Sequence, residues 1–303
     1  MVSHLPEQIE RVQADRIAGK LPPALQRWRN ERVRATRLLL DSLDRDKPLA
    51  DLTRVDIMQL RDRLIARAKT GEIQFGTASR DLTILLAGIR AVSKAFDFGL
   101  RVDDITIEAR KGEKNIRKPI PTDWLRDKLL ARGALNRLNI SQRLIVLICV
   151  NTGARPSEVR DLAVRDIELD GNIPMLNIHP ALHDLKTESS ERRIPLVGVS
   201  LEAAREALAL ATADRRAGKD WLFPTYVGKD ISANVNKYLR KHDLVPSGCT
   251  LYGLRHAFED RLDAAGIQQR VKDDLMGHVH AGERYGDGGG DATRLAAVEK
   301  IAL

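Results

Sequence analysis

The chain of 303 residues is long enough to form two domains, each with its own hydrophobic core. With 43% hydrophobic, 30% charged and only 4% aromatic residues, its composition is that of a soluble, helix-rich globular protein, and no apolar run approaches the length of a membrane span. The formal net charge of +8 favours a polyanionic partner.

The positive charge is concentrated in the first part of the chain. Residues 1–118 contain 24 Lys and Arg against 17 Asp and Glu, whereas the remainder contains 26 against 25. This asymmetry is expected if the N-terminal part binds nucleic acid.

The two cysteines give no sign of a disulfide or a zinc site. Cys149 lies in the apolar run LIVLICV, Cys249 follows a Pro-Ser-Gly turn, and there is no Cys-x-x-Cys pair. The N-terminal sequence also lacks the apolar region of a secretion signal. We therefore expect a cytoplasmic protein without a structural metal.

The first 22 residues are polar and close with a Pro-Pro pair, so we expect an N-terminal extension over 1–22. Apolar residues then recur at helical spacing in three segments, with Thr53 as the N-cap of the second and Thr77 or Ser79 as that of the third. The predicted helices cover 23–43, 55–68 and 78–100. Several amphipathic helices with short links predict an all-α bundle over 23–109.

A basic segment, RKGEKNIRK, occupies 110–118 and is followed by two prolines. It contains five cations and one acid, and its position between two differently patterned halves predicts a basic linker that contacts DNA. A solvated charge run with no partner is the alternative. The candidate DNA-binding cations of this segment are Arg110, Lys111, Lys114, Arg117 and Lys118.

The second half, 119–303, mixes helices with a few short strands. Thr122 is expected to cap a helix to Leu130, and Ser141 to cap an apolar helix that ends near Gly153. Two alternating runs, VRDIEL and PMLNIHP, flank the turn Asp170-Gly171-Asn172 and predict a hairpin, with a third strand in the segment that ends RRIPLV. Further helices are predicted over 200–213, 232–242 and 292–301 and within 250–285.

The motif NTGARPSEV at 151–159 is the first that points to chemistry. Arg155 follows a tight turn at a helix end and precedes Pro156, so its guanidinium is held on rigid backbone and suits bidentate contact with a phosphate. Glu158, three residues on, could orient a cation or cap the helix. Taken alone, Arg155 is more simply interpreted as a surface arginine in a turn.

The segment HDLKTESSERR supplies a second candidate, Lys186, between two strand-like runs. A lysine on a hairpin can reach a leaving oxygen and protonate it if neighbouring cations or burial lower its pKa. A solvated hairpin lysine is the commoner case. We expect the nearby Arg192 and Arg193 to face DNA or solvent.

The stretch 250–285 carries most of the remaining candidates. Arg255 and Tyr252 are three residues apart and lie on one face of a predicted helix, whereas His256 points elsewhere and is expected to support the site. His278 follows Met276-Gly277, and Tyr285 lies seven residues later, just before a Gly-rich run. His278 and His280 form a His-x-His pair, but no third ligand falls at helical spacing, so a metal site is the poorer interpretation.

Taken together, these motifs resemble those of the tyrosine recombinase (phage integrase) family. TGARPSEV is similar to the family's first box and gives Arg155, while the Lys-Thr pair of LKTESSERRIPL resembles the strand-turn lysine and gives Lys186. The family's second box, His-x-x-Arg, gives Arg255. The Leu-Gly-His box resembles LMGH and gives His278, and the nucleophilic tyrosine that follows gives Tyr285.

The resemblance implies a mainly α protein with the tyrosine recombinase fold. A helical core-DNA-binding domain, 23–109, would precede a mostly helical catalytic domain, 119–303, with a small antiparallel β-sheet and a C-terminal helix. It also implies double-stranded DNA as partner, a homotetramer on DNA, and no cofactor, metal, membrane or small-molecule substrate. The C-terminal helix could dock on a neighbouring protomer or on its own domain.

The resemblance also assigns roles. Tyr285 would attack a DNA phosphate to give a 3′-phosphotyrosyl link, and Lys186 would protonate the 5′-oxygen that leaves. Arg155 and Arg255 would clamp the non-bridging oxygens, with His278 and Tyr252 donating hydrogen bonds.

Two departures from the family pattern leave alternatives open. Tyr252 stands where the second box has its histidine, and the interval from His278 to Tyr285 is shorter than in the best-known members. A DNA-binding member that has lost catalysis is therefore one alternative, and a type IB topoisomerase-like activity is another. A metal-dependent relaxase built on His278 and His280 ranks below both.

Overall fold

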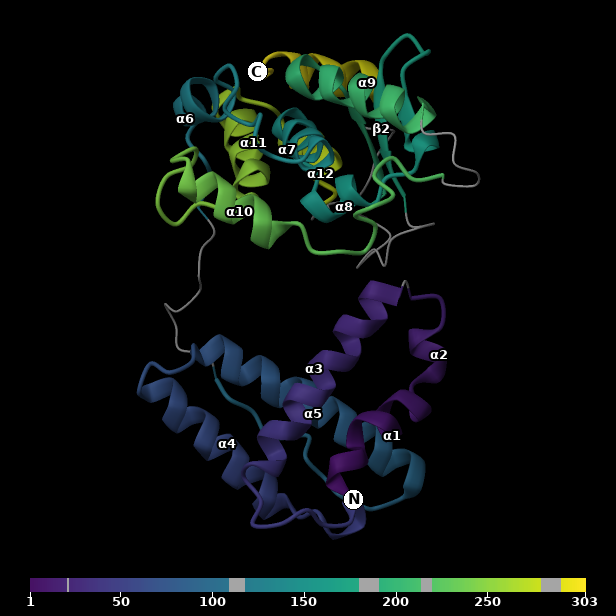
Figure 1. The fold of residues 1–303 in the computed structure, drawn as a ribbon, viewed down its shortest axis with the longest axis vertical. Coiled ribbons are helices and arrows are strands. Elements are labelled where there is room, and N and C mark those ends of the chain that lie inside the picture. The colour runs from purple at the N-terminus through teal and green to yellow at the C-terminus, as the bar shows by residue number, and fades with distance from the viewer. Residues whose placement is uncertain (21, 109–117, 180–190, 214–219, 279–289) are drawn as a thin grey trace. The chain divides into compact units, whose positions relative to one another are not determined.

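A computed structural model describes residues 1–20, 22–108, 118–179, 191–213, 220–278 and 290–303 (Figure 1). The chain divides into two compact units, Met1–Ile116 and Arg117–Leu303. Each unit has a hydrophobic core of its own.

The N-terminal unit is a bundle in which α1, α3 and α4 all pack against α5. Thr53 caps α4 as predicted, because its hydroxyl accepts the Asp56 backbone N–H while the Asp56 carboxylate accepts that of Thr53. The third predicted helix instead begins at Phe75, with Gln74 as its N-cap. The helices of this unit are η1 (Val2–His4), α1 (Leu5–Val12), α2 (Ala14–Ile17), α3 (Pro22–Leu40), η2 (Leu49–Asp51), α4 (Arg54–Lys69) and α5 (Phe75–Phe96).

The first residues of the chain differ from the expected extension. Val2, Leu5 and Ile9 are fully buried in the core of the bundle. Ile9 packs so closely on α5 that a Cβ added at Gly88 would lie 2.3 Å from its Cδ1. The spacing of these three residues places them on one helical face, so α1 is a component of the bundle.

The C-terminal unit is mostly helical, as the sequence predicts. Asn139 caps α7 by accepting the Ser141 backbone N–H, so the predicted cap, Ser141, is wrong by two residues. The helices are α6 (Thr122–Trp124), η3 (Leu125–Leu129), α7 (Ile140–Thr152), α8 (Pro156–Arg160), η4 (Val164–Asp166), α9 (Gly198–Ala213), α10 (Ser232–Lys241), α11 (Gly253–Ala264), α12 (Gln269–Met276) and α13 (Gly290–Glu299).

The described part of this unit contains a three-stranded antiparallel sheet in the order β1-β2-β3. The strands are β1 (Ile167–Glu168), β2 (Met175–Ile178) and β3 (Arg192–Pro195). Leu176 pairs with Ile167 on one side and with Ile194 on the other, and these three residues enter the core from one face. The predicted hairpin and third strand are confirmed.

Helices α7 and α11 pack together at the centre of the unit (Figure 1). Gly153 ends α7 with φ +58, and a Cβ there would lie 2.3 Å from the ring of Phe258 on α11. Glycine is required for both the left-handed backbone and this close approach. The contact fixes the spacing of the two helices that flank the candidate site.

The C-terminal residues form hydrogen bonds with α7 and α11. Arg261 of α11 donates to the carbonyl oxygen of Ile301 at 2.6 Å, and the Asn151 amide of α7 donates to that of Leu303 at 2.8 Å. Val298 and Ile301 are buried in the core. In the single chain, α13 therefore packs on its own domain.

Among the described residues, no helix is both long enough and apolar enough to cross a membrane.

The α7–α11 contact predicts that Gly153→Ala lowers the free energy of unfolding by about 3 kcal/mol, because the new Cβ adds backbone strain and a clash with Phe258. Urea denaturation of the full chain measures the loss. Gly171→Ala is the matched control, since Gly171 has an ordinary φ and its nearest neighbour would lie 3.7 Å away. Equal stability of the two variants would contradict the role given to Gly153.

Candidate active site

Arg155 lies at the N-terminus of α8, directly after the turn that ends α7. Its backbone N–H donates to Glu158 Oε2 at 2.7 Å and its Nη1 to Glu158 Oε1 at 2.6 Å, so one carboxylate fixes both the backbone and the side chain. Pro156 occupies the first turn, where a missing N–H costs nothing. About a third of the Arg155 side chain is exposed (32%), which leaves it open to a ligand.

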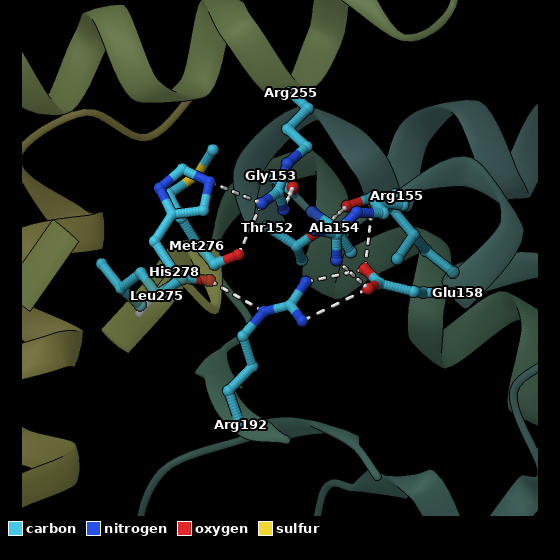
Figure 2. A network of polar contacts seen from close by, with 11 residues as sticks. Thr152, Gly153, Ala154, Arg155, Glu158, Arg192, Arg255, Leu275, Met276 and His278 are labelled. Carbon is cyan, nitrogen blue, oxygen red and sulfur yellow. Dashed lines mark hydrogen bonds and ion pairs between the residues drawn. The ribbon is translucent and has the colours of Figure 1, made fainter. Parts of the chain in front are cut away.

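The Glu158 carboxylate is buried and also holds Arg192 (Figure 2). Arg192 Nη2 lies 2.7 Å from Oε2 and Nη1 lies 3.3 Å from Oε1. Burial alone would raise the pKa of Glu158, but Arg192 and then Arg155 lower it to about 2. Glu158 is therefore ionised at every physiological pH.

The prediction that Arg192 faces DNA or solvent is wrong. Its side chain is 2% exposed, and its Nε donates to the carbonyl oxygen of Leu275 at 3.0 Å. A Cβ at Gly277 would approach Arg192 Nη1 to 3.0 Å, so this glycine makes room for the guanidinium. Arg192 thus joins the end of α12 to Glu158 of α8.

Arg193, the next residue, points the opposite way because side chains alternate along a strand. Its side chain is half-exposed and contacts Glu168 at 3.0 Å and Asp291 at 3.1 Å. These two acids compensate its charge, so the structure gives no particular support for DNA binding by Arg193.

Arg255 lies in the first turn of α11 and is buried. Its Nη1 donates to the Gly153 carbonyl oxygen at 2.8 Å and its Nη2 to that of Met276 at 2.5 Å (Figure 2). Helices α7 and α12 end at these carbonyls, where a helix leaves acceptors unsatisfied and favours a cation. Burial, together with Arg192 and Arg155, lowers the pKa of Arg255 to about 10, and it remains charged near neutral pH.

His278 follows the left-handed Gly277 that ends α12, and its backbone N–H donates to the Asp273 carbonyl oxygen at 2.9 Å. Its Nε2 lies 3.2 Å from Nη2 of Arg255. Burial and then the charge of Arg255 lower the pKa of His278. The two motifs therefore meet in space although 23 residues separate them.

Tyr252 immediately precedes α11 and belongs to the same cluster. Burial lowers the pKa of Arg155, but Glu158 and, to a smaller extent, Tyr252 raise it above its usual value. The His256 ring lies against the Tyr252 ring, with centroids 5.4 Å apart. His256 thus packs on Tyr252, and its supporting role stays a prediction.

Several predicted residues lie outside the described part of the chain. They are Lys186, Tyr285, His280 and four cations of the basic segment, Arg110, Lys111, Lys114 and Arg117. Lys118 is described, and its carbonyl oxygen would lie 2.8 Å from a Cβ at Gly253, at the start of α11.

Among the described residues, the cluster contains three guanidinium groups and one carboxylate, Glu158, which pairs with Arg155 and Arg192. Arg155, Arg192 and Arg255 carry three positive charges and Glu158 one negative, which leaves a net charge of about +2 near an exposed edge of Arg155. No group of three or more His, Cys, Asp or Glu in that same part of the chain is arranged to hold a metal ion. The excess positive charge of the three guanidinium groups suits an oxyanion such as a phosphate.

The phage integrase family model matches residues 127–283, which is more than half of the chain. This chain belongs to the phage integrase family of tyrosine recombinases. The match includes Arg155, Lys186, Arg255 and His278 and ends two residues before Tyr285.

Curated relatives of this integrase family include transposases and recombinases. The chain is 26% identical over 202 residues to the transposase of transposon Tn916 of Enterococcus faecalis, covering 58% of this chain and 49% of the relative. It is 25% identical over 232 residues to the tyrosine recombinase XerC of Lactobacillus delbrueckii, covering 74% and 75%. The chain thus spans about half the length of the transposase that it matches.

Solved integrases and recombinases share the fold. The XerH site-specific recombinase bound to its palindromic difH substrate matches with a TM-score of 0.62 and 14% identity, covering 92% of this chain and 90% of that chain. The Tn1549 transposon integrase with transposon right-end DNA gives 0.56 and 16%, covering 97% and 95%. A lambda integrase dimer bound to a core site gives 0.56 and 19%, covering 91% and 74%. The mainly α fold class is confirmed.

The Arg155–Glu158–Arg192 cluster predicts that Glu158→Gln costs about 3 kcal/mol of stability near pH 7, because two guanidinium groups lose their buried counter-charge. The pKa of Glu158 lies below its ordinary value of 4.5, so its contribution is complete above that pH and declines as pH falls towards about 2. Urea denaturation at pH 7 and pH 3 measures both effects.

The expected result is a gap between wild type and Glu158→Gln that narrows at pH 3. Glu168→Gln is the control, since Glu168 pairs with Arg193 on the surface and its removal should cost well under 1 kcal/mol. A gap for Glu158→Gln that does not change with pH would contradict the ion-pair account.

Proposed function

We propose that this protein cleaves and rejoins DNA at specific sites through a 3′-phosphotyrosyl intermediate. The observation that carries the proposal is the pair Arg155 and Arg255, whose guanidinium groups are fixed by Glu158, Gly153 and Met276 in a cluster with excess positive charge. A family of DNA strand-transferring enzymes supplies the context. Two domain roles belong to this proposal: core-DNA binding by the bundle expected over 23–109, to which the structure adds α1, and catalysis by residues 119–303.

In the proposed reaction, the Tyr285 hydroxyl loses its proton to solvent and its oxygen attacks the phosphorus of a DNA phosphodiester. The bond to the 5′-oxygen breaks, Lys186 gives that oxygen a proton, and a 3′-phosphotyrosyl ester forms. In the reverse step a 5′-hydroxyl from another strand attacks the ester and releases Tyr285. Because one phosphoester replaces another, the reaction requires no net input of chemical energy.

Arg155 and Arg255 would stabilise the charge that develops on the non-bridging oxygens. The two guanidinium groups would stabilise the transition state because they are preorganised. The surrounding acceptors already hold both groups, so little reorganisation is needed when the phosphate binds. Tyr252 and His278 would donate hydrogen bonds to the same phosphate. A phenol can donate such a bond but is not an acid–base group near neutral pH.

The DNA partner would be held mainly through its backbone. The basic segment 110–118 and the positive excess of residues 1–118 provide cations for phosphate contacts. We further propose that the protein acts as a homotetramer on two duplexes, as strand exchange between two DNA sites requires. An impaired DNA-binding member and a topoisomerase are the alternatives that the experiments below separate.

A nicked duplex carrying the core site provides the direct test, with candidate sites taken from the DNA that flanks the gene. We expect a covalent protein–DNA adduct that resists denaturation, because the broken strand end diffuses away and traps the intermediate. Tyr285→Phe should abolish the adduct and retain DNA binding.

Absence of an adduct with wild-type protein that binds the site would favour the impaired DNA-binding member. Relaxation of supercoiled plasmid without any sequence requirement would favour the topoisomerase. An adduct formed equally by Tyr285→Phe would overturn the assignment of the nucleophile.

Arg255→Lys tests the phosphate clamp. Lysine keeps the charge but loses the fork that reaches both the Gly153 and Met276 carbonyl oxygens, so we expect the rate of adduct formation to fall about 10²–10³-fold with a much smaller change in DNA affinity. Arg193→Lys, on the adjacent surface, is the control and should leave the rate within about twofold of wild type. An unchanged rate for Arg255→Lys would contradict the clamp.

A further inference from the structure

The His278 ring lies between a cation and a carboxylate that both come from α11. Its Nε2 is 3.2 Å from Nη2 of Arg255, and its Nδ1 is 3.9 Å from Oε1 of Glu259. Arg255 and Glu259 are four residues apart, which places them one above the other on the same face of α11. The two ring nitrogens of His278 are therefore in opposite electrostatic surroundings.

The contact with Arg255 decides where the ring carries its proton. A guanidinium has donors only, so Nε2 must be the acceptor and the proton of the neutral ring must reside on Nδ1. That nitrogen faces the Glu259 carboxylate at 3.9 Å, whose negative charge favours a proton there. The neutral ring in the free protein thus presents no donor at Nε2.

A bound DNA phosphate changes this balance. The phosphate adds negative charge beside Arg255 and Arg155, whose positive charges disfavour protonation of His278, and it provides an acceptor for an Nε2 proton. Glu259 and, from α12, Asp273 act in the opposite sense and favour the charged ring. An imidazolium would satisfy both sides, with Nε2–H towards phosphate and Nδ1–H towards Glu259.

We propose that Glu259 is a positioning residue for His278, which holds the Nδ1 proton and stabilises the imidazolium that donates from Nε2 to the bound phosphate. The gap of 3.9 Å exceeds a direct hydrogen bond, and a small rotation of Glu259 or one bridging water closes it. The inference rests on the proposed function only in that a DNA phosphate enters the Arg155–Arg255 site. Its consequence is that DNA binding near neutral pH takes up a proton at His278.

Glu259 is well suited to an experimental test because it is partly exposed, with 33% of its side chain accessible. Its replacement by Gln retains shape and removes only the charge, so the variant should fold. Asp260, the next residue of α11, is exposed and provides the matched control, Asp260→Asn. The background is Tyr285→Phe, which permits binding without chemistry.

The first measurement is proton uptake on DNA binding, obtained by calorimetry in two buffers that differ in ionisation enthalpy. At pH 7 we expect uptake of about half a proton or more by the parent protein and by Asp260→Asn, and less than half of that amount by Glu259→Gln. His278→Gln should remove the uptake. Equal uptake by Glu259→Gln and the parent, or uptake that survives in His278→Gln, would overturn the inference.

The second measurement is the pH dependence of adduct formation with Tyr285 restored. Loss of the Glu259 charge should slow Glu259→Gln about three- to tenfold near pH 8, where the imidazolium is scarce, and the two rates should converge as the pH is lowered and the ring in both DNA complexes becomes protonated. A purely structural role would lower the rate equally at all pH values and would contradict the inference.

The two proposals fail in distinguishable ways. If no adduct forms but proton uptake depends on Glu259 and His278, the inference stands and the proposed reaction falls. If adducts form and uptake is insensitive to Glu259, the reaction stands and the inference falls.

Discussion

The ion pair between the buried carboxylate of Glu158 and the guanidinium of Arg192 is the interaction on which the candidate site depends. Burying a carboxylate is costly, and here two arginines and a backbone N–H compensate for it. Because Arg192 also donates to the Leu275 carbonyl oxygen, the same pair ties the end of α12 to the start of α8. One network therefore contacts Arg155 directly, through Glu158, and also contacts the end of α12 that precedes His278.

Helix termini supply most of the remaining acceptors. Arg255 donates to the carbonyls that end α7 and α12, and Arg192 donates to another in the last turn of α12. These carbonyls lack intrahelical partners and lie at the negative ends of helix dipoles, so each arginine both satisfies a helix and gains stabilisation from it. The site can thereby concentrate positive charge without a carboxylate for every guanidinium, and the surplus is available to an anionic ligand.

The sequence identifies Arg155, Arg255 and His278 as candidates, because each lies in a short motif whose glycine or proline fixes the local backbone, and the structure brings the three side chains into one cluster. The role of Arg192 was missed, although the alternation of side chains along a strand implies that Arg192 and Arg193 cannot both face outwards. The Pro-Pro pair at 22–23 marks a helix boundary, but it does not separate the first residues from the fold, because Val2, Leu5 and Ile9 recur at helical spacing and form a buried face. Contacts such as Glu259 with His278 join separate motifs and require the tertiary structure.

A structure of the Tyr285→Phe protein bound to a core-site duplex tests the central claim most directly. The account predicts that a backbone phosphate lies within hydrogen-bond distance of both Arg155 and Arg255, with the Glu158–Arg192 pair intact beneath it. A phosphate held elsewhere, or a bound state in which Glu158 has released Arg192, would contradict the account.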